Sequence, residues 1–189
     1  MKRTKMLAIL FLGLSCSISF AQTSSNLLAD SSFEEWSWDS TSTNWSTFGS
    51  ASCVAETPRT KKFAVKMFGN FTGQTNSSGI FQDVPATAGK SYEGTAYMRQ
   101  NPKDDLKGEN KAWLKLEFYD ADGKQISVAH SLMKLDAKAP SNKYVFITTG
   151  PVQAPPATAK ARFVAIFSQG PDKARGAVFV DDVSLREVP

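Results

Sequence analysis

The sequence is poor in the residues that stabilise many secreted domains and that drive covalent catalysis. It contains two cysteines and one histidine. Cys16 lies in the N-terminal apolar segment considered below, which leaves Cys53 without a partner for a disulfide bond. The sequence has no Gly-x-Ser-x-Gly motif, His130 has no serine or cysteine motif around it, and Cys53 has no neighbouring base. A disulfide scaffold and a serine or cysteine hydrolase are therefore not expected.

The sequence also lacks an apolar run long enough to span a membrane. The run at residues 6–14 is shorter than the roughly 20 residues that a spanning helix needs. Three basic residues precede it and Ser19-Phe20-Ala21 follows it, a pattern typical of an export signal cleaved after Ala21. We expect the protein to be secreted, periplasmic or on the cell surface. Gly13-Leu14-Ser15-Cys16 offers lipidation as an alternative, but its leucine lies one position too close to the cysteine.

Removal of residues 1–21 also removes the excess of positive charge. The whole chain has 22 Lys and Arg against 18 Asp and Glu, and the signal carries three of the basic residues, so 19 against 18 remain. These cations are mixed with acids and form no stripe, so a nucleic-acid partner is not expected. We interpret residues 22–189, which number 168, as a single domain that is large enough to bury a substantial core.

What the sequence does have is a series of short runs of β-branched and aromatic residues with a period of two. The run Asp120-Ala-Asp-Gly123 resembles the start of a calcium loop, but the downstream glutamate of an EF-hand is absent, so we predict a hairpin turn. The number and spacing of the runs predict an all-β fold, a two-sheet antiparallel β-sandwich of the jelly-roll type. The predicted strands are residues 62–68, 79–84, 91–99, 112–119, 126–131, 143–149, 160–167 and 177–185.

Alternation within two of these strands predicts a surface patch. In residues 112–119 the apolar set Leu114, Leu116 and Phe118 would face the core, so the intervening residues would face outward. The same alternation places Tyr97 and Arg99 outward. If the two strands are neighbours or near neighbours in one sheet, their outer faces merge. The expected patch comprises Tyr97, Arg99, Gln100, Trp113, Glu117 and Tyr119.

Such a patch would have the chemistry of a sugar-binding site. The C–H face of a pyranose stacks on an aromatic ring, while guanidinium, carboxylate and amide groups bind its hydroxyls. The alternative is that the long connection at residues 101–110, or the other sheet, covers these rings. Trp36 or Trp38 could line a separate site on a loop spanning residues 36–50, and Gln82 could either order a loop or contact sugar.

The last predicted strand carries two adjacent carboxylates, Asp181 and Asp182. Neighbouring side chains on a strand point to opposite sides, so we expect one of the two to be buried and to need a partner. Glu34 could meet this strand if the two ends of the domain are held together. The partner could be a metal ion, with Asp30 and loop carbonyls as further ligands, or a salt bridge to Lys61 or Lys62.

Short motifs along the chain resemble the carbohydrate-binding modules of families 4, 9 and 22, which are galactose-binding-like β-sandwiches. The motifs are Asn26-Leu-Leu, Phe33-Glu34, Phe81-Gln82-Asp83-Val84, Ala88-Gly89-Lys90-Ser91-Tyr92 and Val180-Asp181-Asp182-Val183-Ser184-Leu185. The resemblance covers nearly all of residues 22–189. It implies a polysaccharide or oligosaccharide ligand on a concave sheet face, and Trp45 as a core residue. It also implies a structural Ca2+ near Glu34 and either Asp181 or Asp182.

We therefore expect a secreted, non-catalytic carbohydrate-binding module, which could act beside a glycan-degrading enzyme. Two other classes stay open. A jelly-roll polysaccharide lyase would use Tyr97, Arg99, Gln100, Tyr119 and His130, and a hydrolase would need two carboxylates such as Glu93 and Glu117 about 5–9.5 Å apart. A structural or adhesive surface domain would have no sugar site.

Overall fold

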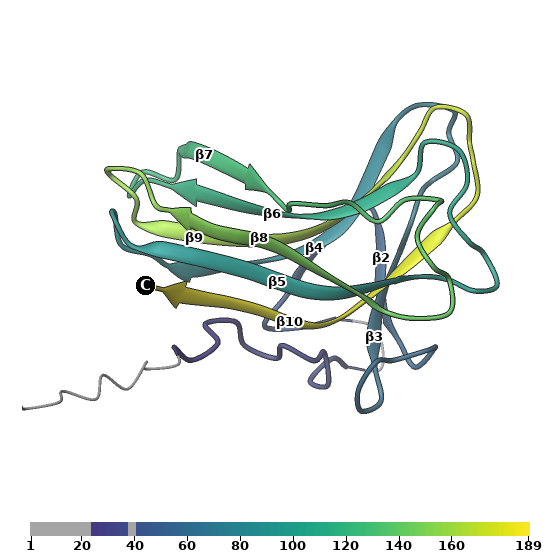
Figure 1. The fold of residues 1–189 in the computed structure, drawn as a ribbon, viewed down its shortest axis with the longest axis horizontal. Helices are drawn as coiled ribbons and strands as arrows, with labels where there is room; N and C mark the ends of the chain where they lie inside the picture. Colours follow the sequence, from purple (N-terminus) through teal and green to yellow (C-terminus); the bar gives the residue numbers. More distant parts are fainter. Residues whose placement is uncertain (1–23, 38–40) are drawn as a thin grey trace, which may run out of the picture.

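The computed structural model describes residues 24–37 and 41–189 (Figure 1). The predicted export signal and Trp38 lie outside these residues. The described chain folds into two antiparallel five-stranded sheets that pack face to face, which confirms the predicted all-β sandwich. No helix that could cross a membrane occurs within the described ranges.

We name the two sheets A and B. Sheet A has the strand order β1-β4-β9-β6-β7, and sheet B has the order β2-β3-β10-β5-β8. The strands of sheet A are β1 (Ser46–Phe48), β4 (Asn76–Pro85), β9 (Lys160–Gln169), β6 (Lys111–Tyr119) and β7 (Gln125–His130). The strands of sheet B are β2 (Ser50–Val54), β3 (Ala64–Phe68), β10 (Ala177–Val188), β5 (Ser91–Gln100) and β8 (Val145–Gln153).

The eight predicted strands correspond to β3 through β10, whereas β1 and β2 were not predicted. The expectation of a loop up to residue 50 is therefore wrong for β1, a three-residue strand in a segment of serine and threonine. The chain changes sheet at Gly49, which separates β1 from β2 and has a φ of 63°. A Cβ at this position would lie 2.5 Å from the backbone oxygen of Ser77, so the crossing requires glycine.

The core lies between the sheets and takes alternate residues from each. Leu114, Leu116 and Phe118 of β6 and Met98 of β5 have no exposed surface. Trp45 is 4% exposed. Its ring lies 5.3 Å from that of Phe33 and 6.1 Å from that of Phe163, which confirms its predicted place in the core.

The two ends of the domain do meet, and hydrogen bonds between the N-terminal segment and β10 hold them together. Asn26 donates through Nδ2 to the carbonyl of Val183 (3.0 Å) and accepts through Oδ1 from the backbone N–H of Leu185 (3.0 Å). The backbone N–H of Leu27 donates to the carbonyl of Leu185 (2.8 Å). Gln82 orders the same segment, because its amide bonds both backbone groups of Ala29. Of the two roles expected for Gln82, the structure supports loop ordering.

Substitution Asn26→Ala should destabilise the domain. It leaves the N–H of Leu185 and the carbonyl of Val183 without their side-chain partner, which costs about 1–3 kcal/mol for groups that are partly buried. Urea unfolding measures the loss, and Ser25→Ala, at an exposed neighbouring position, is the control. Equal unfolding midpoints for the two variants would contradict a role of Asn26 in joining the ends.

Candidate functional site

The outer surface of sheet A carries the aromatic and charged side chains that β6 turns away from the core. Trp113 and Tyr119 are half-buried, and Glu117 is 9% exposed. Leu114, Leu116 and Phe118, which alternate with them, are fully buried, so the predicted alternation within this strand is confirmed. Strand pairing places Arg162 of β9 beside Glu117, and Asp83 of β4 beside Arg162. We call this surface face A and define it by Lys134, whose ammonium group lies over Trp113, together with these strand residues: Phe81, Asp83, Lys111, Trp113, Lys115, Glu117, Tyr119, His130, Lys160 and Arg162.

A network of charged and polar groups crosses the middle of face A. Arg162 binds Asp83 with Nε at 2.6 Å and Nη2 at 3.0 Å, and Lys160 binds the same carboxylate at 2.8 Å. Burial alone would raise the pKa of Asp83, but hydrogen bonds from Arg162 and Lys160 lower it below the ordinary value. Asp83 is therefore ionised and fixed in place at neutral pH, and it holds the guanidinium of Arg162 in one orientation.

Tyr119 links this network to Glu117. The tyrosine hydroxyl donates to Oε2 of Glu117 at 2.7 Å, and Nη1 of Arg162 lies 3.4 Å from the same hydroxyl. Burial and the hydrogen bond to Glu117 raise the pKa of Tyr119 to about 12, so it remains a donor. The cations of Lys160 and Arg162 lie 4.8 and 5.0 Å from its ring centre. Tyr119 therefore provides fixed polar groups more than a free stacking surface.

Trp113 stands at one end of face A beside a pocket. Its indole N–H donates to Nδ1 of His130 at 3.1 Å, and Nζ of Lys134 lies 4.5 Å from its ring centre. The pocket has a volume of about 240 Å³ and is lined by Thr75, Glu109, Lys111, Trp113, Lys134, Ser168 and Gly170. Gly73, in the connection between β3 and β4, contacts Lys173, in the connection between β9 and β10.

The structure divides the predicted six-residue patch. Trp113, Glu117 and Tyr119 lie on face A, but β5 belongs to sheet B, so Tyr97 and Arg99 point from the opposite surface of the sandwich. Figure 1 shows β6 in the upper layer and β5 in the lower layer. The expectation of one shared patch is therefore wrong. Its physical reason is that the connection at residues 101–110 carries the chain from sheet B to sheet A.

Gln100 is not a surface residue at all. It is 2% exposed, its Oε1 accepts from the backbone N–H of Leu106 at 2.8 Å, and its Nε2 donates to the carbonyl of Ala139. The predicted contact of Gln100 with a ligand is therefore wrong. Its amide instead satisfies buried backbone groups of two connections.

The surface around Tyr97, which we call face B and define by Glu93, Tyr97, Arg99 and Phe146, is largely covered near its centre. The guanidinium of Arg59 lies 3.5 Å above the ring of Tyr97, and the ring of Phe146 lies 5.3 Å from it. Nε of Arg99 donates to the carbonyl of Ser141 at 2.9 Å. Cation and backbone contacts thus occupy the groups that a sugar would use on this side.

The residues considered for a lyase, and those considered for a hydrolase, are each divided between the two faces. Tyr97 and Arg99 of the lyase set lie on face B, whereas Tyr119 and His130 lie on face A. Glu93 and Glu117, the carboxylates considered for a hydrolase, also point from opposite surfaces. Neither set converges on one bond of a substrate.

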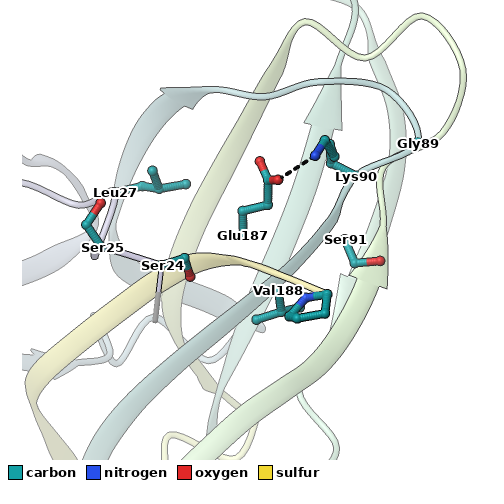
Figure 2. A pocket seen from close by; sticks show the side chains of 9 residues that line it. Ser24, Ser25, Leu27, Gly89, Lys90, Ser91, Glu187 and Val188 are labelled. Atoms are coloured by element: carbon teal, nitrogen blue, oxygen red, sulfur yellow. Dashed lines mark ion pairs between the residues drawn. The ribbon is translucent and has the colours of Figure 1, made fainter. Parts of the chain in front are cut away.

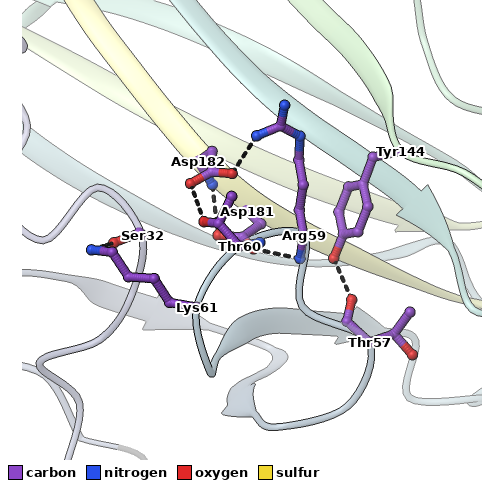
Figure 3. Close-up of polar contacts among 8 residues, drawn as sticks. All are labelled: Ser32, Thr57, Arg59, Thr60, Lys61, Tyr144, Asp181 and Asp182. Atoms are coloured by element: carbon purple, nitrogen blue, oxygen red, sulfur yellow. Dashed lines mark hydrogen bonds and ion pairs between the residues drawn. The ribbon is translucent and has the colours of Figure 1, made fainter.

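Asp181 is the carboxylate of the pair that is buried, with no exposed surface (Figure 3). It lies on the outer side of sheet B, in register with Tyr97, under the loop that precedes β3. The expected strict alternation fails because Asp182 adopts a φ of 46° at an irregularity in the pairing of β10. Both carboxylates therefore reach the same loop.

Backbone N–H groups, the Thr60 hydroxyl and one cation satisfy this pair. Oδ2 of Asp181 accepts from the N–H groups of Arg59 (2.7 Å) and Thr60 (3.1 Å). Nη1 of Arg59 lies 2.6 Å from Oδ2 of Asp182. The expected salt bridge to Lys61 or Lys62 is thus replaced by one to Arg59. Nζ of Lys61 binds the hydroxyl of Ser32 at 2.8 Å instead.

The calcium ion that the resemblance implies stays a prediction. Oδ2 of Asp30 is buried without a hydrogen-bond partner, which is the kind of oxygen that a cation would bind. Glu34, however, accepts from the N–H groups of Lys62 and Phe63, and the oxygens of Asp181 also accept from N–H groups. Among residues 24–37 and 41–189, no three acidic, histidine or cysteine side chains gather as metal ligands. A calcium ion at Glu34, Asp181 and Asp182 would therefore have to share these carboxylates with backbone N–H donors.

A larger pocket, of about 730 Å³, lies between the two ends of the described chain (Figure 2). Its walls include short side chains such as Ser24, Ser25 and Ser91, together with an ion pair of 2.9 Å between Lys90 and Glu187. No aromatic ring lines it. Face A, which has both rings and a pocket, is the stronger candidate for a binding site.

Comparison with known proteins supports the fold. TmCBM61, solved in complex with β-1,4-galactotriose, matches with a TM-score of 0.54 and 15% identity over 87% of this chain and 100% of that chain. The CBM22-1 xylan-binding domain of Paenibacillus barcinonensis Xyn10C matches with a TM-score of 0.57 and 16% identity, over 89% and 98% of the two chains. The chain shares the fold of these carbohydrate-binding modules. No protein-family model and no curated protein matches the sequence.

The same fold also occurs within a longer chain. The CBM22-1–GH10 modules of Clostridium thermocellum xylanase 10B, solved with xylohexaose, match with a TM-score of 0.58 and 13% identity. The match covers 87% of this chain and 28% of that chain. At these identities the likeness establishes architecture, and the role of each residue has to come from the geometry of face A.

Sequence reasoning missed several residues of face A, above all Arg162, Asp83 and Lys134. Arg162 and Lys160 are two residues apart in a strand that was predicted, so they share one side of it. Their outward direction could therefore have been predicted from the sequence. Its placement beside Glu117 depends on β9 pairing with both β4 and β6, which no local pattern encodes. Of the residues of the early tryptophan segment, Trp36 packs against the core.

The burial of Asp181 predicts an unusual dependence of stability on pH. Burial and the charge of Asp182 raise the pKa of Asp181 to about 6, despite the N–H donors. Because the folded state then holds a proton that the unfolded state releases, this group stabilises the fold increasingly as pH falls from 7.5 to 4.5, by about 2 kcal/mol. Urea unfolding of the wild type and of Asp181→Asn should show their stability difference shifting by this amount in favour of the wild type. A difference that stays constant or shifts the other way would contradict it.

Proposed function

We propose that this protein is an exported, non-catalytic module that binds a polysaccharide across face A. The observation that carries the proposal is Trp113, which stands at the wall of a pocket on the outer surface of a sheet. A fixed network of Arg162, Tyr119 and Glu117 lies on the same surface. The protein shares its fold with one module solved in complex with β-1,4-galactotriose and with another that is a xylan-binding domain.

The groups of face A match what a sugar chain offers. The indole of Trp113 would stack on the C–H face of one ring. Glu117 would accept from hydroxyls and Arg162 would donate to them, and both are held in place before the ligand arrives. Each net hydrogen bond contributes about 1 kcal/mol, so a weak to moderate affinity is expected, spread over several sugar units.

The absence of catalysis is part of the proposal and has its own support. The residue sets that a lyase or a hydrolase would use are separated by the thickness of the sandwich. On face A itself, Asp83 is neutralised by two cations, so it is poorly suited to act as a general acid or base. Incubation with the bound polysaccharide should therefore release neither reducing ends nor unsaturated products.

Export and a partner enzyme are the finer elements of the proposal. The pattern of residues 1–21 supports export. In xylanase 10B a module of this fold is joined to a GH10 module in one chain, which supports a role of this module beside a glycan-degrading enzyme. A structural calcium ion near Glu34 and the Asp181–Asp182 pair stays a separate prediction of the family resemblance.

Substitution Trp113→Ala should lower the affinity for a bound polysaccharide by about tenfold or more. Loss of one aromatic stack and its buried area corresponds to about 1.4 kcal/mol or more. Affinity electrophoresis against xylan, β-1,4-galactan and a broader glycan panel measures the change.

Phe146→Ala is the matched control, because it removes a ring that is 48% exposed on face B. Its retention should equal that of the wild type. Binding that survives Trp113→Ala but is lost in Phe146→Ala would place the site on face B and overturn the proposal. Absence of retention on every glycan would instead favour a structural or adhesive domain.

A further inference from the structure

Two lysines beside Trp113 form no ion pair within the part of the chain that the structure describes. Lys111 lies two residues before Trp113 and points from the same side of β6, and Lys134 lies over the indole ring. Within residues 24–37 and 41–189, neither forms an ion pair with a carboxylate, whereas Lys160 and Arg162 pair with Asp83. The cations of face A that lack a partner are thus both at the pocket.

The residues that line the pocket carry a net positive charge. They include two lysines, Lys111 and Lys134, and one acid, Glu109, which lies against Gly170 on the opposite connection. Asp172, whose carboxylate also lies beside Gly170, does not line the pocket. Burial and the positive charges of Lys115 and Lys134 lower the pKa of His130. It is therefore neutral at pH 7, as its acceptance of the Trp113 N–H through Nδ1 requires, and its other nitrogen is a donor.

The position of Lys134 favours the stacking of an acidic sugar on Trp113 over that of a neutral sugar. A sugar ring that stacks on the side of Trp113 where Lys134 lies must displace its ammonium group, which is 4.5 Å from the ring centre. A neutral sugar has no charged group that could replace the lost cation–π contact of the Lys134 ammonium group. A carboxylate on the stacked sugar would replace that contact with an ion pair to Lys134 and would also pair with Lys111.

We propose that the pocket beside Trp113 binds a uronic acid unit, whose ring stacks on the indole while Lys111 and Lys134 hold its carboxylate. This inference rests on the proposed function, because it names the class of sugar that face A takes. Glu117, Tyr119 and Arg162 would then bind the neighbouring units of the same chain.

The test pairs each acidic polymer with its own uncharged form. Binding of polygalacturonate, alginate and glucuronoxylan is measured by isothermal titration calorimetry beside the carboxyl-reduced product of each polymer. At least one acidic polymer should bind at least tenfold more tightly than its reduced counterpart, and the difference should shrink between 50 and 500 mM NaCl, because salt screens exposed charges.

The double variant Lys111→Gln/Lys134→Gln should abolish this preference while retaining binding to the reduced polymer. The control is Lys138→Gln/Lys143→Gln, which removes the same charge from two exposed lysines between β7 and β8 and should keep the preference. Equal loss in both double variants would show a general charge effect and would overturn the inference.

The outcomes separate this inference from the function on which it rests. Trp113-dependent binding to neutral polymers without any preference for their acidic forms would leave the proposed function standing and overturn the uronate site. Failure to bind any of the polymers, acidic or neutral, would overturn both.

Discussion

Leu114, Leu116 and Phe118 are held between the sheets, and their burial determines what β6 presents on its other side. Each fully buried side chain of this size contributes about 1.5–3 kcal/mol, so a one-residue shift of the strand would expose all three at a large cost. Phe118 also packs against Tyr92 of sheet B, with ring centres 6.1 Å apart. The core thus fixes Trp113 and its alternate neighbours on the outer surface, and every functional statement about face A depends on this.

The strands beside β6 turn that surface into an organised face. Pairing with β9 and, through it, β4 brings Arg162 and Asp83 into one line with Glu117, although these residues are far apart in the sequence. Their mutual hydrogen bonds leave few polar groups free to reorganise when a ligand binds. The opposite surface uses its residues differently, because Arg59 covers Tyr97 and its backbone satisfies Asp181. One surface therefore carries the proposed ligand site, whereas the residues of the other contact the loop that precedes β3.

Features that depend on the local sequence could be predicted, whereas features that depend on how distant strands pair could not. Alternation correctly oriented Trp113, Glu117 and Tyr119, and would also have placed Gln100 inward had it been applied one residue further. Contact between the two ends was considered from the carboxylates Glu34, Asp181 and Asp182, whereas the hydrogen bonds of Asn26 that join them were not predicted. The assignment of β5 and β6 to different sheets was not accessible, since it depends on the path of the connection at residues 101–110. β1 was missed because three polar and aromatic residues carry no periodic signal.

The central claim is that a sugar chain lies on face A, and a nuclear magnetic resonance titration tests it most directly. A ¹⁵N-labelled sample is titrated with an oligosaccharide that the intact protein binds, and the shifts of backbone and indole N–H signals are followed. The account predicts the largest shifts at the Trp113 indole and at the amides of Glu117 and Arg162, with the amides of Tyr97 and Phe146 unchanged. Shifts centred on Tyr97 and Phe146, with the Trp113 indole unmoved, would contradict it.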